Sequence, residues 1–190
     1  MGSVGVLAVQ GDFIEHVHTL RRLGRPSREV RLPEDLSKVD ALIIPGGEST
    51  TIGKLAHRFG LTEVIRERAL QGMPLWGTCA GLIFMAKNLG AHDQPTLHVM
   101  DVTVERNAFG SQLESFESDL PISALGEEPF HAVFIRAPII ERAGDNVDVL
   151  AVLADGRIVA AEQNNLLGTS FHPELTDDLR FHEYFVAMIG

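Results

Sequence analysis

One short stretch, which contains the only cysteine of the chain, most constrains how this sequence can fold. The apolar run 73–76 has the length of a buried strand, and residues 82–89 have helical spacing. Gly77, Thr78, Cys79, Ala80 and Gly81 lie between them. This order predicts a strand, a sharp turn and a helix, with the thiol at the turn. It is the cysteine counterpart of the G-x-S-x-G nucleophile elbow.

The two glycines that flank the cysteine suit a strained turn. A Cβ atom on either neighbour would collide with the adjoining strand or helix. The first N–H groups of the helix would face the reacting centre, where they can stabilise an oxyanion and favour thiolate over thiol. A lone cysteine is otherwise most often a small buried hydrophobe. The glycine frame after a strand favours catalysis over that interpretation.

The remaining apolar segments alternate between strand and helix lengths. In the first half we expect strands at 4–9, 29–32 and 41–44 and helices at 13–23, 51–59 and 62–71. In the second half we expect strands at 99–105, 130–136, 147–153, 157–163 and 166–171, with an Asp155-Gly156 hairpin turn. A last helix, capped by Thr176 and running to 188, would carry Phe181, Phe185 and Met188 on one face. The pattern predicts one α/β domain with a mixed sheet and helices on both faces.

Composition excludes several classes of function. The chain has 190 residues, enough for one sizeable domain, and a formal net charge of −10. With no basic surplus to neutralise phosphates, nucleic acid is an improbable partner. A single cysteine rules out an intrachain disulfide framework and fits a reducing cytosol. No stretch approaches the roughly 20 apolar residues of a membrane span, and the first residues do not read as a signal peptide.

A base and an orienting group for the thiol lie far downstream. His172 and Glu174 follow the last expected strand, two residues apart, so in an extended segment their side chains share one side. Glu174 could then accept a hydrogen bond from one ring nitrogen while the other nitrogen faces Cys79. An incidental surface ion pair is the alternative, and the presence of the elbow argues against it.

A glycine pair follows the expected strand 41–44 and should reach the same sheet edge, where such sheets bind ligands. Gly46 and Gly47 would let main-chain N–H groups approach a substrate closely. A phosphate-loop interpretation fails because Glu48 and Leu55 stand where that motif needs Gly and Ser or Thr.

The other histidines indicate no metal site. His16 and His18 are two apart on an expected helix, so they face different directions and cannot share a metal ion. We expect the remaining ones to be surface or packing residues: His57, His92, His98, His131 and His182.

The elbow and the His-Pro-Glu segment together resemble the class I, triad-type glutamine amidotransferases. Within that group the chain is most similar to the glutaminase subunits of pyridoxal 5′-phosphate synthase. The resemblance runs nearly end to end, and its most specific segments are Glu48-Ser49-Thr50-Thr51 and Ile135-Arg136-Ala137-Pro138. It implies a single amidotransferase domain over 1–190, with a three-layer, flavodoxin-like fold around a mostly parallel mixed sheet.

The resemblance also implies roles for individual residues. Cys79 would be the nucleophile, His172 the base and then the acid, and Glu174 the group that orients His172. The oxyanion donors would be main-chain N–H groups of Gly47 and Ala80. The implied glutamine-binding residues are Gly46, Gly47, Glu48, Ser49, Arg106, Ile135 and Arg136. No metal or organic cofactor is implied.

The implied reaction is hydrolysis of L-glutamine to L-glutamate and ammonia in the cytoplasm. The ammonia would pass to a separate synthase subunit, a (β/α)₈ barrel in a large hetero-oligomer, for vitamin B6 biosynthesis. Because free ammonia is wasteful, we expect the Gly46-Gly47 turn to change conformation when that partner docks. The sequence departs from the family at Ser111, where an arginine is usual; this affects binding of the substrate or the partner if that arginine contacts either.

Three alternatives stay open at this point. The chain could serve a different biosynthetic synthase, such as one of an imidazole or anthranilate pathway. It could be an intracellular cysteine peptidase or related hydrolase on a similar scaffold. It could also be a catalytically silent subunit, although a silent subunit has no reason to keep Cys79, His172 and Glu174 together.

Overall fold

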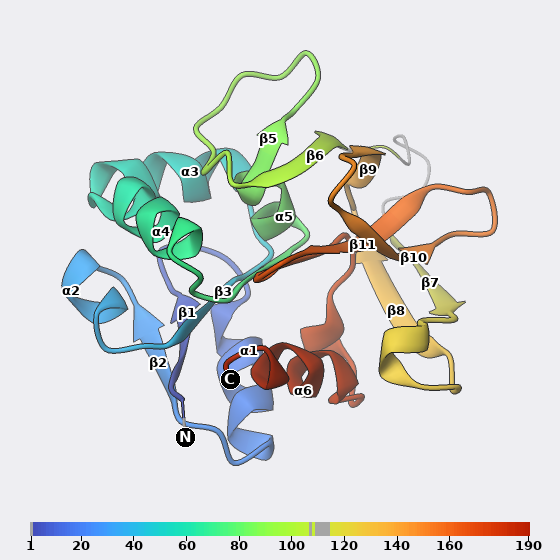
Figure 1. Cartoon of the computed structure of the whole chain (residues 1–190), viewed down its shortest axis with the longest axis horizontal. Helices are drawn as coiled ribbons and strands as arrows, with labels where there is room; N and C mark the ends of the chain where they lie inside the picture. The colour runs from blue at the N-terminus through green and yellow to red at the C-terminus, as the bar shows by residue number, and fades with distance from the viewer. Residues whose placement is uncertain (1, 107, 109–114) are drawn as a thin grey trace.

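Five parallel strands form the centre of the molecule (Figure 1). The computed structural model describes residues 2–106, 108 and 115–190. The parallel strands, in spatial order, are β2 (Ser27–Val30), β1 (Val4–Leu7), β3 (Ala41–Ile44), β4 (Leu75–Thr78) and β12 (Leu166–Thr169). An order of 2-1-3-4 followed by one more strand is that of flavodoxin-like sheets. The expected flavodoxin-like α/β fold is therefore confirmed.

Helices cover both faces of this sheet because successive strand residues point to opposite sides. In β4, Leu75 packs into one core cluster and Trp76 into the other. On the Leu75 side lie α2 (Pro33–Leu36), α3 (Ser49–Arg58), α4 (Leu61–Leu70) and α5 (Ala80–Met85). On the Trp76 side lie α1 (Phe13–Arg22) and α6 (Arg180–Ala187) (Figure 1). The expected three layers are present.

The second half of the chain extends the sheet with mostly antiparallel strands. Next to β12 come β11 (Ile158–Gln163), β9 (Ile139–Ala143), β6 (Met100–Glu105) and β5 (Ala86–Asn88), while β10 (Asp148–Val152) pairs with β11. A separate hairpin joins β7 (Ser115–Leu120) to β8 (Phe130–Ile135). The Asp155-Gly156 turn between β10 and β11 is confirmed, with Gly156 at a φ of 87°.

The helix after the elbow is shorter than its spacing suggests. Helix α5 ends at Met85, and the chain becomes extended at Ala86, where we expected the helix to run to residue 89. The chain returning through Leu97 and Val99 explains the early end. Their N–H groups donate to the carbonyls of Phe84 and Met85, at 2.7 and 3.1 Å. A tertiary contact thus satisfies the last helix carbonyls that a longer helix would have used.

The expected cap of the last helix is also wrong. Thr176 follows a 3₁₀ turn, Pro173–Leu175, and its hydroxyl donates to the Pro173 carbonyl at 3.0 Å. Helix α6 begins only at Arg180, but Phe181 and Phe185 share one face of it, as expected, and both are fully buried. Four elements have polar or short sequences that gave no clear signal: α2, β5, β7 and β9.

The elbow has the strained geometry that its glycines predict. Cys79 has φ 48° and ψ −103°, a conformation that side chains rarely adopt. A Cβ on Gly77 would lie 2.5 Å from the carbonyl carbon of Gly81, and a Cβ on Gly81 would overlap the carbonyl oxygen of Ile44. The Cys79 N–H is held by the Thr169 carbonyl at 2.8 Å. The turn therefore fits only because residues 77 and 81 have no side chain, which leaves room for the main chain of β3 and of α5 beside it.

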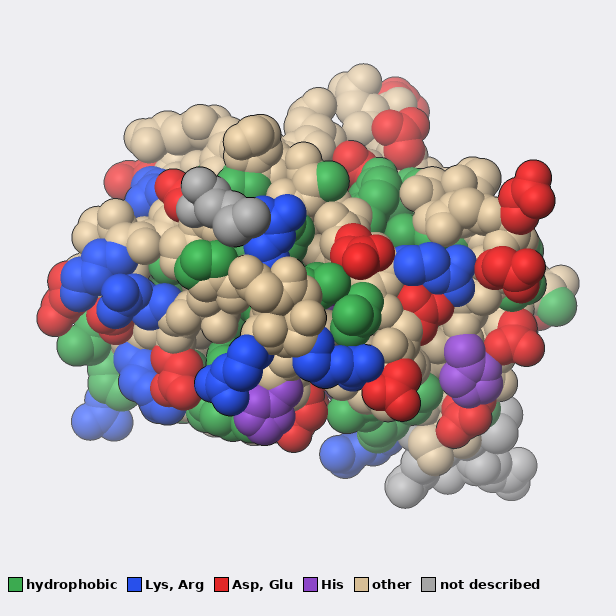
Figure 2. Space-filling view, turned by 90° about the horizontal axis from the view of Figure 1, so that it is seen from below, with side chains coloured by type: hydrophobic (Ala, Val, Ile, Leu, Met, Phe, Trp, Pro, Cys, Tyr) green, Lys and Arg blue, Asp and Glu red, His purple; other side chains and the backbone are tan. Residues whose placement is uncertain are grey.

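The face of the molecule below the sheet mixes charges of both signs. Figure 2 shows Lys and Arg side chains beside Asp and Glu side chains there, with no continuous patch of one sign. Within the described residues, no helix is both long enough and apolar enough to span a bilayer.

The close packing at Gly81 makes a stability prediction. Gly81→Ala should lower the free energy of unfolding by about 1–3 kcal/mol or more, because the new methyl group would overlap the main-chain carbonyl of Ile44 in β3. Urea denaturation measures this. Gly24→Asn is the control, since Gly24 has an αL conformation, φ 65°, and open space around it, so its cost should stay below about 1 kcal/mol. Equal stability of both variants would contradict the packing argument.

Candidate active site

The candidate residues gather at the carboxyl ends of four neighbouring strands. Cys79 follows β4, Gly46 follows β3, Asp12 lies in the loop after β1, and His172 lies in the loop after β12. This edge of a parallel sheet is where ligands bind in such folds. The structure therefore brings Gly46, Cys79 and His172 together, as the motif analysis expected, and it adds Asp12, which that analysis did not name.

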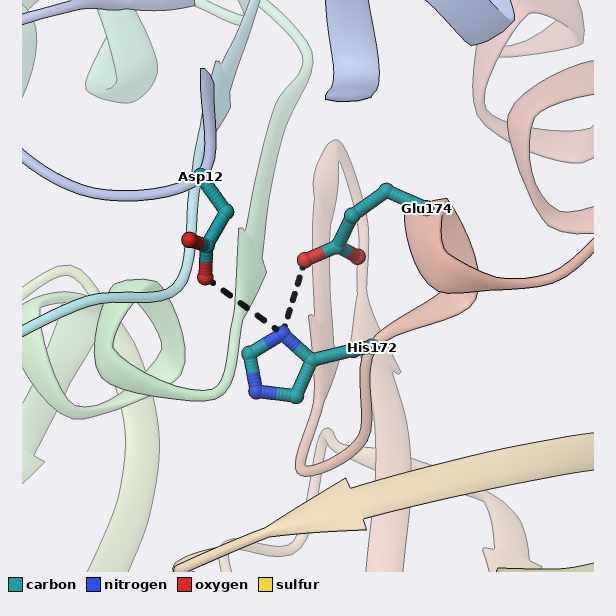
Figure 3. Close-up of side chains that lie close together, drawn as sticks. All are labelled: Asp12, His172 and Glu174. Atoms are coloured by element: carbon teal, nitrogen blue, oxygen red, sulfur yellow. Dashed lines mark hydrogen bonds and ion pairs between the residues drawn. The ribbon is translucent and has the colours of Figure 1, made fainter. Parts of the chain in front are cut away.

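His172 and Glu174 form a buried pair. The ring nitrogen Nδ1 of His172 lies 2.7 Å from Oε1 of Glu174, and the side chains are 4% and 0% exposed (Figure 3). Burial alone lowers the pKa of His172, but hydrogen bonds with Cys79 and Glu174 outweigh it and raise that pKa to about 10. The imidazole is thus built to carry a proton beside the thiol.

Burial acts on Glu174 in the opposite sense. It raises the pKa of this carboxyl group, and the hydrogen bond from His172 works against that rise. The two side chains therefore depend on each other. Each would be costly to ionise alone in this position, and together they form a satisfied pair.

Asp12 is a third member of this cluster. Its Oδ2 lies 3.9 Å from Nδ1 of His172, on the other side of the ring nitrogen from Glu174 (Figure 3). The carboxylate and imidazole ligand atoms of Asp12, His172 and Glu174 all lie within 4.8 Å of one another. The nitrogen that would bind a metal ion is already hydrogen-bonded to Glu174, so hydrogen bonding accounts for the cluster.

The thiol is enclosed. Cys79 is 7% exposed, and its Sγ lies 3.9 Å from the carbonyl oxygen of Ile135, at the end of β8. Arg136, the next residue, has φ 43° and an exposed side chain. A positive φ in a residue other than glycine costs energy, and such strain is often found at functional sites. The Ile135-Arg136 segment thus forms one wall beside the nucleophile.

The Gly46-Gly47 turn fits between this cluster and the loop after β1. A Cβ on Gly46 would overlap Cε1 of His172, so only glycine leaves room for the ring. The Gly46 carbonyl accepts from the Asp12 N–H at 3.0 Å. Gly47 has φ 149°, and a Cβ there would lie 2.6 Å from Oε1 of Gln10. That same Gln10 oxygen accepts from the Glu48 N–H at 2.8 Å.

Glu48 caps helix α3. Its carboxylate accepts from the N–H groups of Thr50 and Thr51, at 3.2 and 2.7 Å, and from the Thr51 hydroxyl at 2.6 Å. The Thr51 hydroxyl is the main cause that lowers the pKa of Glu48. This is the usual role of an N-cap side chain, and it fixes the start of the segment that follows the glycine pair.

Arg106 reaches the same segment from the end of β6. Its guanidinium donates to Oε1 of Gln94 at 2.7 Å and lies 3.6 Å from the Glu48 carboxylate. The hydroxyls of Ser49 and Thr50 donate to the same Gln94 oxygen, each at 3.3 Å. The expected binding residues Glu48, Ser49 and Arg106 are thus held together, because Arg106 contacts Glu48 and because Gln94 accepts from both Ser49 and Arg106.

Sequence reasoning missed four residues around the site. Gln10, Asp12 and Gln94 lie in loops without a motif, and His16 was treated only as a possible metal ligand. The prediction that His16 and His18 face different ways is correct, since His16 is buried and His18 is exposed. A carboxylate or amide directly after the first strand was the one signal available for Gln10 and Asp12. Ser111, where the family usually has arginine, lies outside the described residues.

The elbow thiol, the buried imidazole and the buried carboxylate have the arrangement of a nucleophile, a base and an orienting acid. Such an arrangement is typical of enzymes that transfer acyl groups through a cysteine thiol. Comparison with known proteins narrows the class. The model of the SNO glutamine amidotransferase family matches residues 6–190, and the chain belongs to that family.

Relatives of known name agree with this assignment. The chain is 61% identical over 188 residues to pyridoxal 5′-phosphate synthase subunit PdxT of Roseiflexus castenholzii, covering 98% of this chain and 100% of the relative. It is 55% identical to the protein of that name from Thermus thermophilus, covering 100% and 98%. A crystal structure of a glutamine amidotransferase superposes with a TM-score of 0.94 at 52% identity, covering 98% of both chains.

The contact between Gly46 and His172 makes a second prediction. Gly46 has no left-handed φ, so Gly46→Ala suits the backbone, but its methyl group must push the His172 ring aside. We expect alkylation of Cys79 by iodoacetamide to slow by about 100-fold, the order of a lost general base. Thermal unfolding monitors the fold in parallel. Unchanged alkylation in a folded variant would show that the ring position does not matter.

Proposed function

We propose that this chain hydrolyses L-glutamine to L-glutamate and ammonia as the glutaminase subunit of a pyridoxal 5′-phosphate synthase. The observation that carries the proposal is the buried His172, hydrogen-bonded to Glu174 and facing the elbow thiol of Cys79. Family membership and the 55–61% identity to proteins named for this synthase support the pathway.

The chemistry follows from the three side chains. His172 accepts the thiol proton, and Cys79 attacks the carbon of the glutamine side-chain amide. The proton on His172 then passes to the leaving nitrogen, and ammonia departs from a thioester. His172 next takes a proton from water, which attacks the thioester. Glutamate leaves, and the thiol regains its proton. Glu174 stabilises the imidazolium in both halves of the reaction.

The surrounding residues would bind the substrate. Main-chain N–H groups of Gly47 and Ala80, the latter at the start of α5, would receive the oxyanion. Glutamine also carries a charged amino group and a charged carboxylate, which need fixed partners of opposite sign. In this proposal Glu48, Arg106 and Arg136 supply those charges, and the remaining binding residues are Gly46, Ser49 and Ile135.

The wider setting is part of the same proposal. Residues 1–190 would act as one amidotransferase domain in the cytoplasm and pass ammonia to a synthase subunit. That partner would be a (β/α)₈ barrel in a large hetero-oligomer, as the family resemblance implies.

Docking would change the Gly46-Gly47 turn. In the present conformation the Gly46 carbonyl points at the Asp12 N–H, so the Gly47 N–H of the same planar peptide points the opposite way. Rotation of this peptide would break one hydrogen bond and re-aim one oxyanion donor. A glycine at each position permits that movement at low steric cost.

Glutamate release from L-glutamine, with and without the synthase subunit, tests the proposal. We expect activity that rises with the partner and disappears in Cys79→Ala, because only the thiol can form the thioester. Activity with a different synthase and none with this one would instead favour another biosynthetic pair. Turnover of peptides without any partner would favour a cysteine hydrolase. Silence towards every substrate would leave a non-catalytic subunit.

The charge network at Arg106 makes a separate prediction. Arg106→Gln should raise the KM for glutamine by about tenfold, the order of a lost charge-assisted hydrogen bond, with little change in kcat. Steady-state kinetics in the presence of the synthase subunit measures both constants. Arg58→Gln, an exposed arginine in the last turn of α3, is the matched control. An equal KM in both variants would remove Arg106 from the substrate site.

A further inference from the structure

The second oxygen of Glu174 is not accounted for by the three-residue site. Oε1 receives the hydrogen bond from His172, whereas Oε2 is buried and has no hydrogen-bond partner of ordinary geometry in the described part of the chain. Nε2 of His16 lies 3.5 Å from it, and both side chains are 0% exposed. A buried carboxylate oxygen without a donor is costly, so this neighbour is significant.

His16 sits on α1 behind Glu174, with contacts on both of its ring nitrogens. Nδ1 lies 2.9 Å from Nε2 of His182, on α6. Nε2 lies 3.3 Å from the hydroxyl of Thr78, the residue before the elbow cysteine. The ring of His16 also meets the Trp76 ring edge-on, with centroids 5.6 Å apart. Its position is thus fixed by two helices and the elbow strand.

Both buried histidines are neutral. Burial lowers the pKa of His16 well below its usual value, and repulsion from a protonated His182 or His172 would lower that pKa further. Burial also lowers the pKa of His182 to about 3. A neutral imidazole has one N–H and one acceptor nitrogen. The chemistry of the cluster therefore depends on which nitrogen of His16 carries the hydrogen.

The two tautomers leave different groups unsatisfied. With the hydrogen on Nδ1, His16 would donate to His182, and Glu174 Oε2 would face an acceptor nitrogen. The unpartnered Nδ1 of His182 would then carry a buried N–H. With the hydrogen on Nε2, His16 offers a donor to Oε2 and to the neighbouring Thr78 hydroxyl, and the Nε2–H of His182 donates to Nδ1 of His16. Only the Nδ1 lone pair of His182 then lacks a partner. This costs less than a buried N–H and a buried carboxylate oxygen that both lack partners, so the second tautomer is favoured.

We propose that His16 is a positioning residue that donates its Nε2–H to Glu174 Oε2. The hydrogen bonds then converge on the Glu174 carboxylate, which accepts from His172 at Oε1 and from His16 at Oε2, while His182 donates to His16 from behind. Hydrogen bonds at reacting groups are often long before substrate binds and shorten later. The 3.5 Å contact would shorten as the His172 imidazolium forms, because Glu174 must then stay ionised. This inference rests on the proposed function of Cys79, His172 and Glu174.

Three substitutions separate positioning from packing. His16→Gln can keep an N–H near the Nε2 position, His16→Asn keeps one near Nδ1, and His16→Leu has neither. We expect Gln to retain kcat within about threefold, whereas Asn and Leu lower kcat by about 10- to 100-fold with little change in KM. His57→Gln, on the exposed end of α3, is the control. Equal losses in all three His16 variants would overturn the proposal.

The pH profile gives a readout that a packing role would not move. The titratable groups that face Glu174 are His172, His16 and Asp12, with Cys79 beyond His172 and His182 beyond His16. Without the His16 donor, the Glu174 carboxylate is less stabilised and protonates at higher pH. The acid limb of the kcat/KM profile should therefore move to higher pH in His16→Leu and His16→Asn, and it should keep its position in His16→Gln.

The tautomer can be observed in the unmodified protein. Nitrogen-15 spectra of labelled histidine distinguish Nε2–H from Nδ1–H, and assignment through the His16→Gln variant identifies the signal. We expect Nε2–H at His16. A hydrogen on Nδ1 would overturn the proposal even if the kinetics agreed. If the unmodified protein released no glutamate, the proposed function would fail, but this spectrum would still decide the inference about His16.

Discussion

The packing of two glycines around one strained cysteine is the constraint on which the rest of this structure depends. Cys79 adopts a positive φ because the helix must leave the strand at once, and Gly77 and Gly81 leave no room for a side chain. The carbonyl of Ile44 closes the gap from the neighbouring strand. The elbow therefore depends on close packing against the neighbouring strand. A methyl group on Gly77 or Gly81 would disturb both the turn and the sheet edge that carries the site.

Burial gives the site its electrostatic character. Glu174 and His172 are both withdrawn from water, so each stabilises the ionised form of the other more than it would at a surface. The glycine at position 46 serves the same end, because it lets the ring of His172 lie against the main chain. Behind them, the neutral His16 faces the carboxylate from the core. With the proposed hydrogen bond from His16, the polar groups form one buried network, and the mostly apolar packing on both sides holds it in place.

The parts of the fold with strong local signals were predictable. Buried runs such as 41–44 and the glycine frame around Cys79 specify strands and a turn by themselves. Their predicted positions lie close to the observed ones. The end of α5 and the start of α6 were not, because contacts from distant segments override the local pattern there. Leu97 and Val99 take the carbonyls that would have continued α5, and spacing alone carries no information about them.

The sequence by itself determined the α/β class, the elbow and the candidate set of Cys79, His172 and Glu174, because each depends on residue types at short spacing. Only the tertiary structure decided which side chains surround that set. Asp12 and His16 come from the start of the chain and Gln94 from a loop without a motif, and they meet the site through strand order and helix packing. Such contacts join residues that no local pattern relates, and burial then makes each of them energetically important.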